Sequence, residues 1–327
     1  PPRSNKKIRE HPVKFSGLSR GKKVSMLKEK LRDIGANILI LTKPDSISWL
    51  LNIRGSDVSH SPIVKSLALV CTDGKVELFL YKNRVTQKIA KTLKNVANIH
   101  TIENFPHYLN KIHGSKLLLD PATCPHKILE IINVGENNVL YGKDLCTQMK
   151  AIKNPIEING ARQAHIIDAT AFLNFLFWFE NKSKKERLNE INVVKVLEKF
   201  RVKTGVLQDI AFDTICGSGP NAAIIHYRVN TKTNRVLKKN DSILIDSGGQ
   251  YLMGTTDVTR TIAVGVPKPA VVKAYTLVLK GLIGISKLVW PPGLSGKEID
   301  AFARSALWAC GHDFEHGSGH GIGSYLS

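Results

Sequence analysis

Residues 242–264 read SILIDSGGQYLMGTTDVTRTIAV. The apolar run before Asp246 predicts a buried strand that ends in this carboxylate, and Asp257 opens a second strand. If the two strands pair through the segment between them, their aspartates face each other across a sheet. Two carboxylates held that close repel each other unless a cation lies between them. Taken alone, each aspartate also has a purely structural interpretation, in which Asp246 belongs to a turn and Asp257 caps a strand or pairs with Arg260.

Three histidines accompany these aspartates. His316 and His320 stand four residues apart in HGSGHGIG, where the glycines disfavour a helix and indicate a backbone that another group approaches closely. His226 follows the apolar run AAII, and a lone histidine at such a place is more often a satisfied core or turn residue. Two aspartates and a histidine are good ligands for a divalent metal that activates water. The predicted metal ligands are Asp246, Asp257 and His320.

The composition of the 327 residues limits the class of protein. The length suits two domains with ordinary cores, and 43% hydrophobic with 23% charged residues is typical of a soluble globular protein. Five scattered cysteines without a Cys-x-x-Cys pair favour a reducing, cytoplasmic setting over a disulfide framework or zinc finger. The net charge of +20 is spread over the chain, so we expect a lysine-rich surface and no specific nucleic-acid site. We see no apolar run of membrane-spanning length and expect no membrane partner.

Residues 1–153 predict a mixed α/β domain with a central sheet. Amphipathic or capped segments alternate with short apolar runs, and Asp73-Gly74 is a strong hairpin signal. Asp45 is expected to cap a short helix that carries Trp49. The other predicted helices are 24–35, 84–95 and 126–133, and the predicted strands are 38–41, 67–72, 76–80, 117–120 and 139–141.

Residues 154–327 predict a second, α+β domain. Asn154-Pro155 marks its start, because proline suits the first turn of a helix. Helices then precede and follow a group of strands, with a charged loop at 181–187. The predicted helices are 156–180, 189–203, 270–288 and 296–309, and the predicted strands are 211–216, 223–227, 242–246 and 258–264.

Four ordered motifs carry a resemblance to a known family: AIIHY at 223–227, DSGGQY at 246–251, GTTDVTRT at 254–261 and HGSGHGIGSY at 316–325. They closely resemble those of aminopeptidase P, the Xaa-Pro aminopeptidase family with the pita-bread metallopeptidase fold. The segments KPDSISW at 43–49, NIRGSD at 52–57, LDPA at 119–122 and AIKNP at 151–155 extend the resemblance over nearly the whole chain. It looks like the three-domain form of the enzyme without its first domain.

The resemblance implies a fold and a set of partners. The fold is α+β, with a pita-bread catalytic domain at 154–327 behind a mixed α/β creatinase/prolidase-type N-terminal domain at 1–153, the middle domain of the longer form. The substrates would be peptides with proline at the second position. The intact family form would be a cytoplasmic homodimer.

The resemblance also implies roles for individual residues. Asp246 would bind one divalent metal, Asp257 would bridge two, usually manganese, and His320 would bind through its imidazole. A metal-bridging hydroxide would attack the carbonyl before the proline. His226 would assist proton movement or hold the developing negative charge, and His316 would line the pocket on the proline side.

The chain also departs from the family pattern. The family completes its site with two glutamates and a further histidine that would lie after Ser327, and Met253 stands where an aspartate is common. Three ligands carry too little negative charge to hold two dications firmly. We therefore expect a fragment, incomplete at its C-terminus and inactive or weakly active, with an unpaired sheet edge. The alternative is a non-catalytic pita-bread module that binds peptides or proteins. Prolidase, methionine aminopeptidase and creatinase are weaker options.

Overall fold

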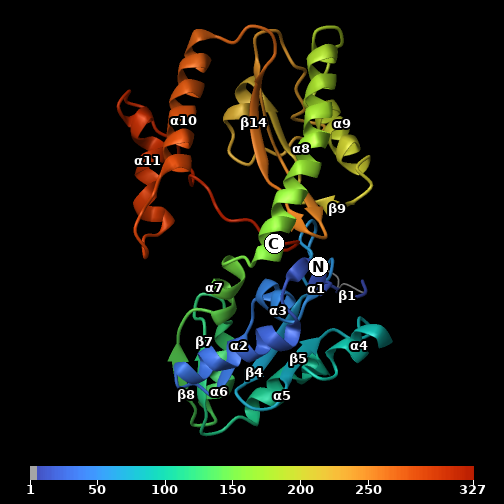
Figure 1. The fold of residues 1–327 in the computed structure, drawn as a ribbon, viewed down its shortest axis with the longest axis vertical. Coiled ribbons are helices and arrows are strands. Elements are labelled where there is room, and N and C mark those ends of the chain that lie inside the picture. Colours follow the sequence, from blue (N-terminus) through green and yellow to red (C-terminus); the bar gives the residue numbers. More distant parts are fainter. Residues whose placement is uncertain (1–5) are drawn as a thin grey trace.

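The computed structural model describes residues 6–327 and divides them into two halves, one below the other in Figure 1. The lower half is built on a six-stranded sheet of order β6-β5-β4-β2-β7-β8. The β2–β4 and β4–β5 pairs are antiparallel and the others are parallel. The strands are β2 (Ile38–Leu41), β4 (Ser66–Cys71), β5 (Val76–Leu80), β6 (Ala97–Thr101), β7 (Lys116–Leu119) and β8 (Asn138–Tyr141).

Both faces of this sheet are buried, which explains its continuous apolar strands. Along β2, Leu39 and Leu41 point into one core cluster and Ile40 into another on the opposite face. The predicted Asp73-Gly74 hairpin joins β4 and β5, and Gly74 has the positive φ of 72° that such a turn requires.

The helices of the lower half lie around the sheet. They are α1 (Val13–Ser16), α2 (Arg20–Asp33), α3 (Pro44–Leu50), α4 (Gln87–Leu93), α5 (Phe105–Asn110), α6 (His126–Asn133) and α7 (Leu145–Ala151). A short antiparallel pair, β1 (Arg9–Glu10) and β3 (Ile53–Arg54), lies beside them. The predicted cap Asp45 is wrong: Lys43 is the N-cap of α3 and Asp45 lies in its first turn, because Pro44 takes the first helical position.

The upper half begins with the long helix α8 (Pro155–Ser183) and α9 (Glu190–Val202). Asn154 caps α8 and forms a capping box with Glu157, which sets the helix start where Asn154-Pro155 predicted it. The predicted loop at 181–187 begins later than expected, because α8 continues to Ser183. The apolar face of α8 packs against α9 and a sheet through one core cluster, which includes Phe172, Phe175, Phe179, Val193, Leu197, Ile243 and Ile245.

Two small sheets follow in the upper half. One has the order β10-β11-β14, formed by β10 (Ile215–Ser218), β11 (Ser242–Ser247) and β14 (Val258–Ala263). The other has the order β13-β12-β9, formed by β9 (Leu207–Ile210), β12 (Gly249–Tyr251) and β13 (Gly254–Thr255). Within residues 6–327, β14 pairs with β11 alone.

The predicted strand at 223–227 is wrong, and the predicted strand at 211–216 is displaced. Residues 219–223 form a 3₁₀ turn, η2 (Gly219–Ala223), that leads into a bend. Gly219 turns the chain with a φ of 54°, and Ile224 and Ile225 stay about half exposed, at 53% and 50%. No other element within residues 6–327 covers these two isoleucines, so forming a strand would not bury them. The hydrophobic pattern was therefore misleading at this point.

The last two helices, α10 (Pro269–Lys287) and α11 (Gly296–Trp308), pack against each other and stand to one side of β14 (Figure 1). By length and composition alone α10 could cross a membrane, with a mean hydropathy of 1.3 and 11% of that window buried. The sequence-based expectation of no such run therefore missed α10. α10 carries Lys273 and Lys280, and it packs on α11 at Gly281.

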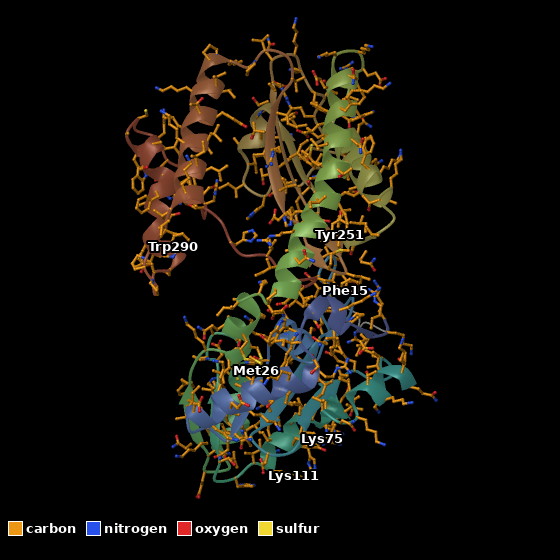
Figure 2. All side chains as sticks on the ribbon, in the orientation of Figure 1. Phe15, Met26, Lys75, Lys111, Tyr251 and Trp290 are labelled. Atoms are coloured by element: carbon orange, nitrogen blue, oxygen red, sulfur yellow. The ribbon has the colours of Figure 1, made fainter. Side chains whose placement is uncertain are left out.

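The two halves meet at a polar seam. Asn154 Nδ2 donates to the carbonyl of Ser16 at 2.9 Å, and the nearby Phe15 lies at the junction in Figure 2. On the other side of the seam, the two ring nitrogens of His60 lie 3.3 Å from Asp209 and 3.1 Å from Asp213. The last residues of the chain run back into the same seam, so segments from both halves share it.

Candidate metal centre

The antiparallel pair β11–β14 brings the two predicted aspartates together. Asp246 is opposite Thr259, and the last pair of the ladder joins Ser247 to Val258. Asp257 precedes that last pair, so it lies diagonally from Asp246 on the same face of the sheet. The conditional expectation of two aspartates meeting across paired strands agrees with this register, except that they are diagonal neighbours and not directly opposite.

The environment of Asp246 is unfavourable for a negative charge. Burial raises the pKa of Asp246 above its ordinary value, and the charge of Asp257 raises it further. A hydrogen bond with Thr259 and the proximity of His226 act in the other direction without cancelling the effect. The Oδ1 atom of Asp246 is buried and has no hydrogen-bond partner. An unpartnered, buried carboxylate oxygen is the condition that a bound cation would relieve.

His320 reaches the same place from the glycine-rich C-terminal segment. Its Nε2 lies 3.3 Å from Asp257 Oδ2, and its Nδ1 lies 2.9 Å from the carbonyl of Gly321. If Nδ1 donates its proton to that carbonyl, Nε2 offers a lone pair toward the carboxylate, and two acceptors then face each other. A histidine that binds a metal usually donates its other ring N–H to a carbonyl or carboxylate in this way.

The three predicted ligands therefore form a line with Asp257 at its centre. Among residues 6–327, no three histidine, cysteine, aspartate or glutamate side chains converge as a ready-made metal cage. The unpartnered oxygen of Asp246, the Asp257 carboxylate and the His320 imidazole nonetheless fit a cation chemically. His320 is 72% exposed and Asp257 is 26% exposed, so the line lies open to solvent. The structural alternative for Asp257, a pair with Arg260, does not occur, since the guanidinium of Arg260 bonds the carbonyl of Thr259.

His226 is held near this line by a hydrogen-bonded loop. The residue has a φ of 54° and an exposed side chain. The neighbouring Tyr227 donates from its hydroxyl to Glu190, at 3.1 Å. The same Glu190 carboxylate accepts from the amide of Ser218 at 2.7 Å and from Asn221 Nδ2 at 3.1 Å. One buried carboxylate therefore fixes both ends of the turn that carries His226.

His316 lies at the α11 end of the glycine-rich segment. Its Nδ1 bonds the carbonyl of Gly317 at 2.8 Å, and its ring is tilted against that of Phe314, with the ring centroids 4.6 Å apart. The backbone carbonyl of His316 accepts from Arg304 Nη2 at 2.7 Å. Its contacts connect it to α11, and the role expected for it at the proline side of a substrate stays a prediction.

The sequence patterns missed the residues that hold these side chains in place. They are Glu190 for the His226 loop, and Arg54 and Arg304 for the segment that carries His320. Glu190 begins a helix and Arg54 lies in a strand, places where charged residues are common on surfaces, so their sequence positions carried no signal that they would be buried. The closest hint was the NIRGSD segment, where an arginine stands among residues that the structure buries.

Two family models match adjacent parts of the chain. A model of the creatinase/prolidase N-terminal domain matches residues 1–157, and a model of metallopeptidase family M24 matches residues 159–327. The change from one model to the next falls at the start of α8.

Several fungal proteins are similar over the entire chain. The protein named "Probable Xaa-Pro aminopeptidase P" from Coccidioides posadasii is 38% identical over 340 residues, covering 100% of this chain and 55% of the relative. A protein of the same name from Aspergillus fumigatus is 37% identical over 339 residues, covering 100% and 51%. The chain thus spans about half the length of the curated relatives it matches.

Solved structures show the same likeness. The X-prolyl aminopeptidase of Caenorhabditis elegans, described as a cytosolic enzyme with a di-nuclear active site, superposes with a TM-score of 0.94 at 33% identity. It covers 100% of this chain, and this chain covers 54% of it. The Xaa-Pro dipeptidase of Bacillus anthracis has a TM-score of 0.74 at 23% identity over 94% of this chain and 83% of its own, a likeness of fold alone.

Proposed function

The chain belongs to metallopeptidase family M24, and on this premise we propose that it serves the metal-dependent release of the first residue from peptides with proline second. The two-part fold expected from the resemblance, a creatinase/prolidase-type domain followed by a pita-bread domain, is confirmed. The boundary between Lys153 and Asn154 is part of the proposal and is supported by the capped start of α8.

The line formed by Asp246, Asp257 and His320 carries the proposal. Asp246 would bind through its unpartnered Oδ1, Asp257 would lie between two ions, and His320 would bind through Nε2. Divalent ions, when bound, supply Lewis-acid activation of a water molecule. Manganese is the metal we propose, because hard carboxylate oxygens suit it.

The two further histidines take substrate-facing roles in the proposal. His226 stands exposed beside Asp246, where it can hold or transfer a proton at the peptide bond under attack. His316 would face the proline ring, whose shape must provide the specificity because an Xaa-Pro bond has no N–H.

We further propose a cytoplasmic protein that forms a homodimer, and sedimentation analysis tests that oligomeric state.

The charge of the three ligands limits what they hold. Two carboxylates cannot neutralise two dications, so we propose that the 327-residue chain binds one ion more tightly than a second and shows little or no turnover. Equilibrium dialysis with Mn²⁺ measures stoichiometry and affinity for the wild-type chain. Asp257→Asn and His320→Ala should each weaken the first site by at least about tenfold, and His312→Ala provides a matched control.

A peptide experiment separates enzyme from binding module. The wild-type chain with Mn²⁺ is incubated with a tripeptide whose second residue is proline, and release of the first residue is followed. Metal-dependent release that is lost in Asp257→Asn supports catalysis, and release at the rate of a typical peptidase would refute the low-turnover statement. Binding of the peptide without release supports the alternative, a non-catalytic module. A wild-type chain that binds no Mn²⁺ would overturn the proposed function.

A further inference from the structure

His320 lies on a segment whose glycines have open space beside them. A Cβ added at Gly317, Gly319 or Gly321 would meet no atom within 4 Å, so the backbone has open space on the side where a side chain would lie. The contacts of His320 itself are with Asp257 and the adjacent Gly321 carbonyl. The position of the histidine therefore depends on how the two ends of its segment are held.

One end is held by α11. Arg304 Nη1 donates to Asp313 Oδ1 at 2.9 Å and to the carbonyl of Phe314 at 2.6 Å, and its guanidinium stacks 4.0 Å from the Phe314 ring. Arg304 Nη2 also donates to the carbonyl of His316, and Asp300 accepts a hydrogen bond from Ser318. The N-terminal end of the segment is thus attached within the upper half.

The other end is held by the N-terminal half. Arg54, at the end of β3, is buried at 2% exposure and donates from Nε to the carbonyl of Tyr325 at 2.5 Å and from Nη2 to that of Ser324 at 3.2 Å. Its Nη1 donates to the carbonyls of Ser48 and Ile53, which fixes the guanidinium to its own domain.

The residues next to this anchor are buried as well. The Tyr325 ring lies 5.7 Å from His11, and Leu326 joins the core cluster of the N-terminal half at 3% exposure. The chain between His320 and Ser324 spans at most roughly 14 Å when extended. The position of this anchor therefore limits where His320 can lie.

We propose that Arg54 is a positioning residue for the metal centre: by holding the Ser324 and Tyr325 carbonyls, it fixes where His320 meets Asp257. The N-terminal domain then contributes to metal binding without providing a ligand. The inference rests on the proposed function in one respect only, that His320 and Asp257 bind the metal.

A buried arginine that bonds only carbonyls supports this role. Burial lowers the pKa of Arg54 to about 9, which reflects the cost of keeping the guanidinium away from water. An apolar side chain would serve packing at lower cost, whereas a planar fork of donors can fix two backbone carbonyls in one geometry.

The test compares Arg54→Met and Arg54→Lys with two controls. Lys23→Met removes another buried basic side chain of the same domain, one that bonds Trp49 and Asn52 and not the C-terminal segment. Leu31→Ala lowers stability through a cavity in the same core. Mn²⁺ affinity, the visible spectrum of bound Co²⁺, hydrogen exchange of amides 317–323 in the metal-free protein, and thermal unfolding are measured for each.

Arg54→Met should weaken Mn²⁺ binding roughly tenfold, change the Co²⁺ spectrum and speed exchange at 317–323. In Arg54→Lys each of these changes should be smaller, since lysine keeps the positive charge and loses only the forked pair of guanidinium donors. Leu31→Ala should lower the unfolding temperature and leave affinity and spectrum unchanged.

Wild-type affinity and exchange in Arg54→Met, or an equal loss of affinity in Leu31→Ala, would overturn the inference. If Arg54→Met does not fold, Arg54→Lys decides by the same readouts. If the wild-type chain binds no metal, the proposed function fails, and the exchange of 317–323 still decides whether Arg54 holds the segment.

Discussion

At the scale of single residues, the Asp246 carboxylate lowers the stability of the metal-free fold and favours metal binding. Its buried, unpartnered Oδ1 and the nearby Asp257 make its charge costly in the metal-free protein. The same features suit a cation, because a ligand oxygen that already has hydrogen-bond partners would have to give them up. Stability and metal binding should therefore respond in opposite directions when this charge is removed.

Asp246→Asn should stabilise the metal-free chain and weaken Mn²⁺ binding by at least about tenfold. Because the folded pKa of Asp246 is raised, its contribution to stability is present below the unfolded pKa and is lost as pH rises through the folded value. The variant should remove that loss, so its thermal midpoint should exceed that of the wild type at pH 7 without metal. Differential scanning calorimetry and metal dialysis measure the two effects.

Asp241→Asn is the matched control for this change. Burial alone would raise the pKa of Asp241, but the hydrogen bonds from the Arg235 side chain and the Lys238 backbone, together with the charges of both residues, outweigh it and lower that pKa. The variant should therefore destabilise the chain and leave Mn²⁺ affinity unchanged. A lower thermal midpoint for both asparagine variants would contradict the inference that the charge of Asp246 destabilises the metal-free chain.

At the scale of elements, α10 and α11 approach closely at one glycine. A Cβ at Gly281 would lie 2.0 Å from the carbonyl of Ala303 on α11, whereas one at Gly284 would lie 3.6 Å from that of Phe302, an ordinary contact. The helix pair carries Arg304, which holds one end of the His320 segment. Packing at Gly281 is thereby linked to the metal centre.

Gly281→Ala should destabilise the chain by about 1–3 kcal/mol, because the methyl group overpacks the helix contact. Gly284→Ala should stabilise it by about 0.5–1 kcal/mol, because alanine is the better helix former and its methyl group fits beside Phe302. Urea unfolding compares the two variants of one helix. Equal effects of the two substitutions would show that α10 and α11 do not pack as described.

How well an element could be predicted depended on whether its pattern is periodic. The strand Val76–Leu80 and the helix His126–Asn133 have the bounds expected from sequence, because alternation and helical spacing report burial directly. The run 223–227 failed, because an apolar stretch beside Pro220 reports hydrophobicity and not a pairing partner. The meeting of Asp246 and Asp257 could be predicted from sequence, because it follows from the pairing of their strands. The contact of His320 with Asp257 rested on the family resemblance alone, since a glycine-rich segment has no periodicity.

At the scale of the whole molecule, the two halves share a set of buried ionisable groups. Lys23 on α2 interacts with Arg54 and with Glu157 at the start of α8, and His11 lies near both cations. Burial, together with these two charges, lowers the pKa of His11 to about 2, so its ring is neutral. Burial and the charge of Arg54 lower the pKa of Lys23 from 10.5 to about 7.

The seam therefore predicts a pH dependence with a definite sign. Above pH 7 folded Lys23 is largely neutral, and its two hydrogen bonds, to the Trp49 carbonyl and Asn52 Oδ1, need no positive charge. In the unfolded chain Lys23 keeps its proton up to its ordinary pKa of 10.5. Between pH 7 and 10.5 the unfolded chain therefore binds more protons than the folded one. Stability should rise with pH across that window.

The rise should amount to about 1 kcal/mol between pH 7 and 8.5, a range below the ordinary pKa of lysine and arginine in the unfolded chain. Lys23→Met should flatten this part of the curve, because no proton is then released at residue 23 on folding. Lys22→Met, at an exposed neighbour, should leave the slope unchanged. Urea unfolding free energies at half-unit steps of pH measure all three chains. Burial also raises the pKa of Cys146, which lowers stability as pH rises, but this effect is common to all three chains and cancels in their differences. An unchanged slope in Lys23→Met would mean that Lys23 enters the seam with its charge and that Glu157 holds it there.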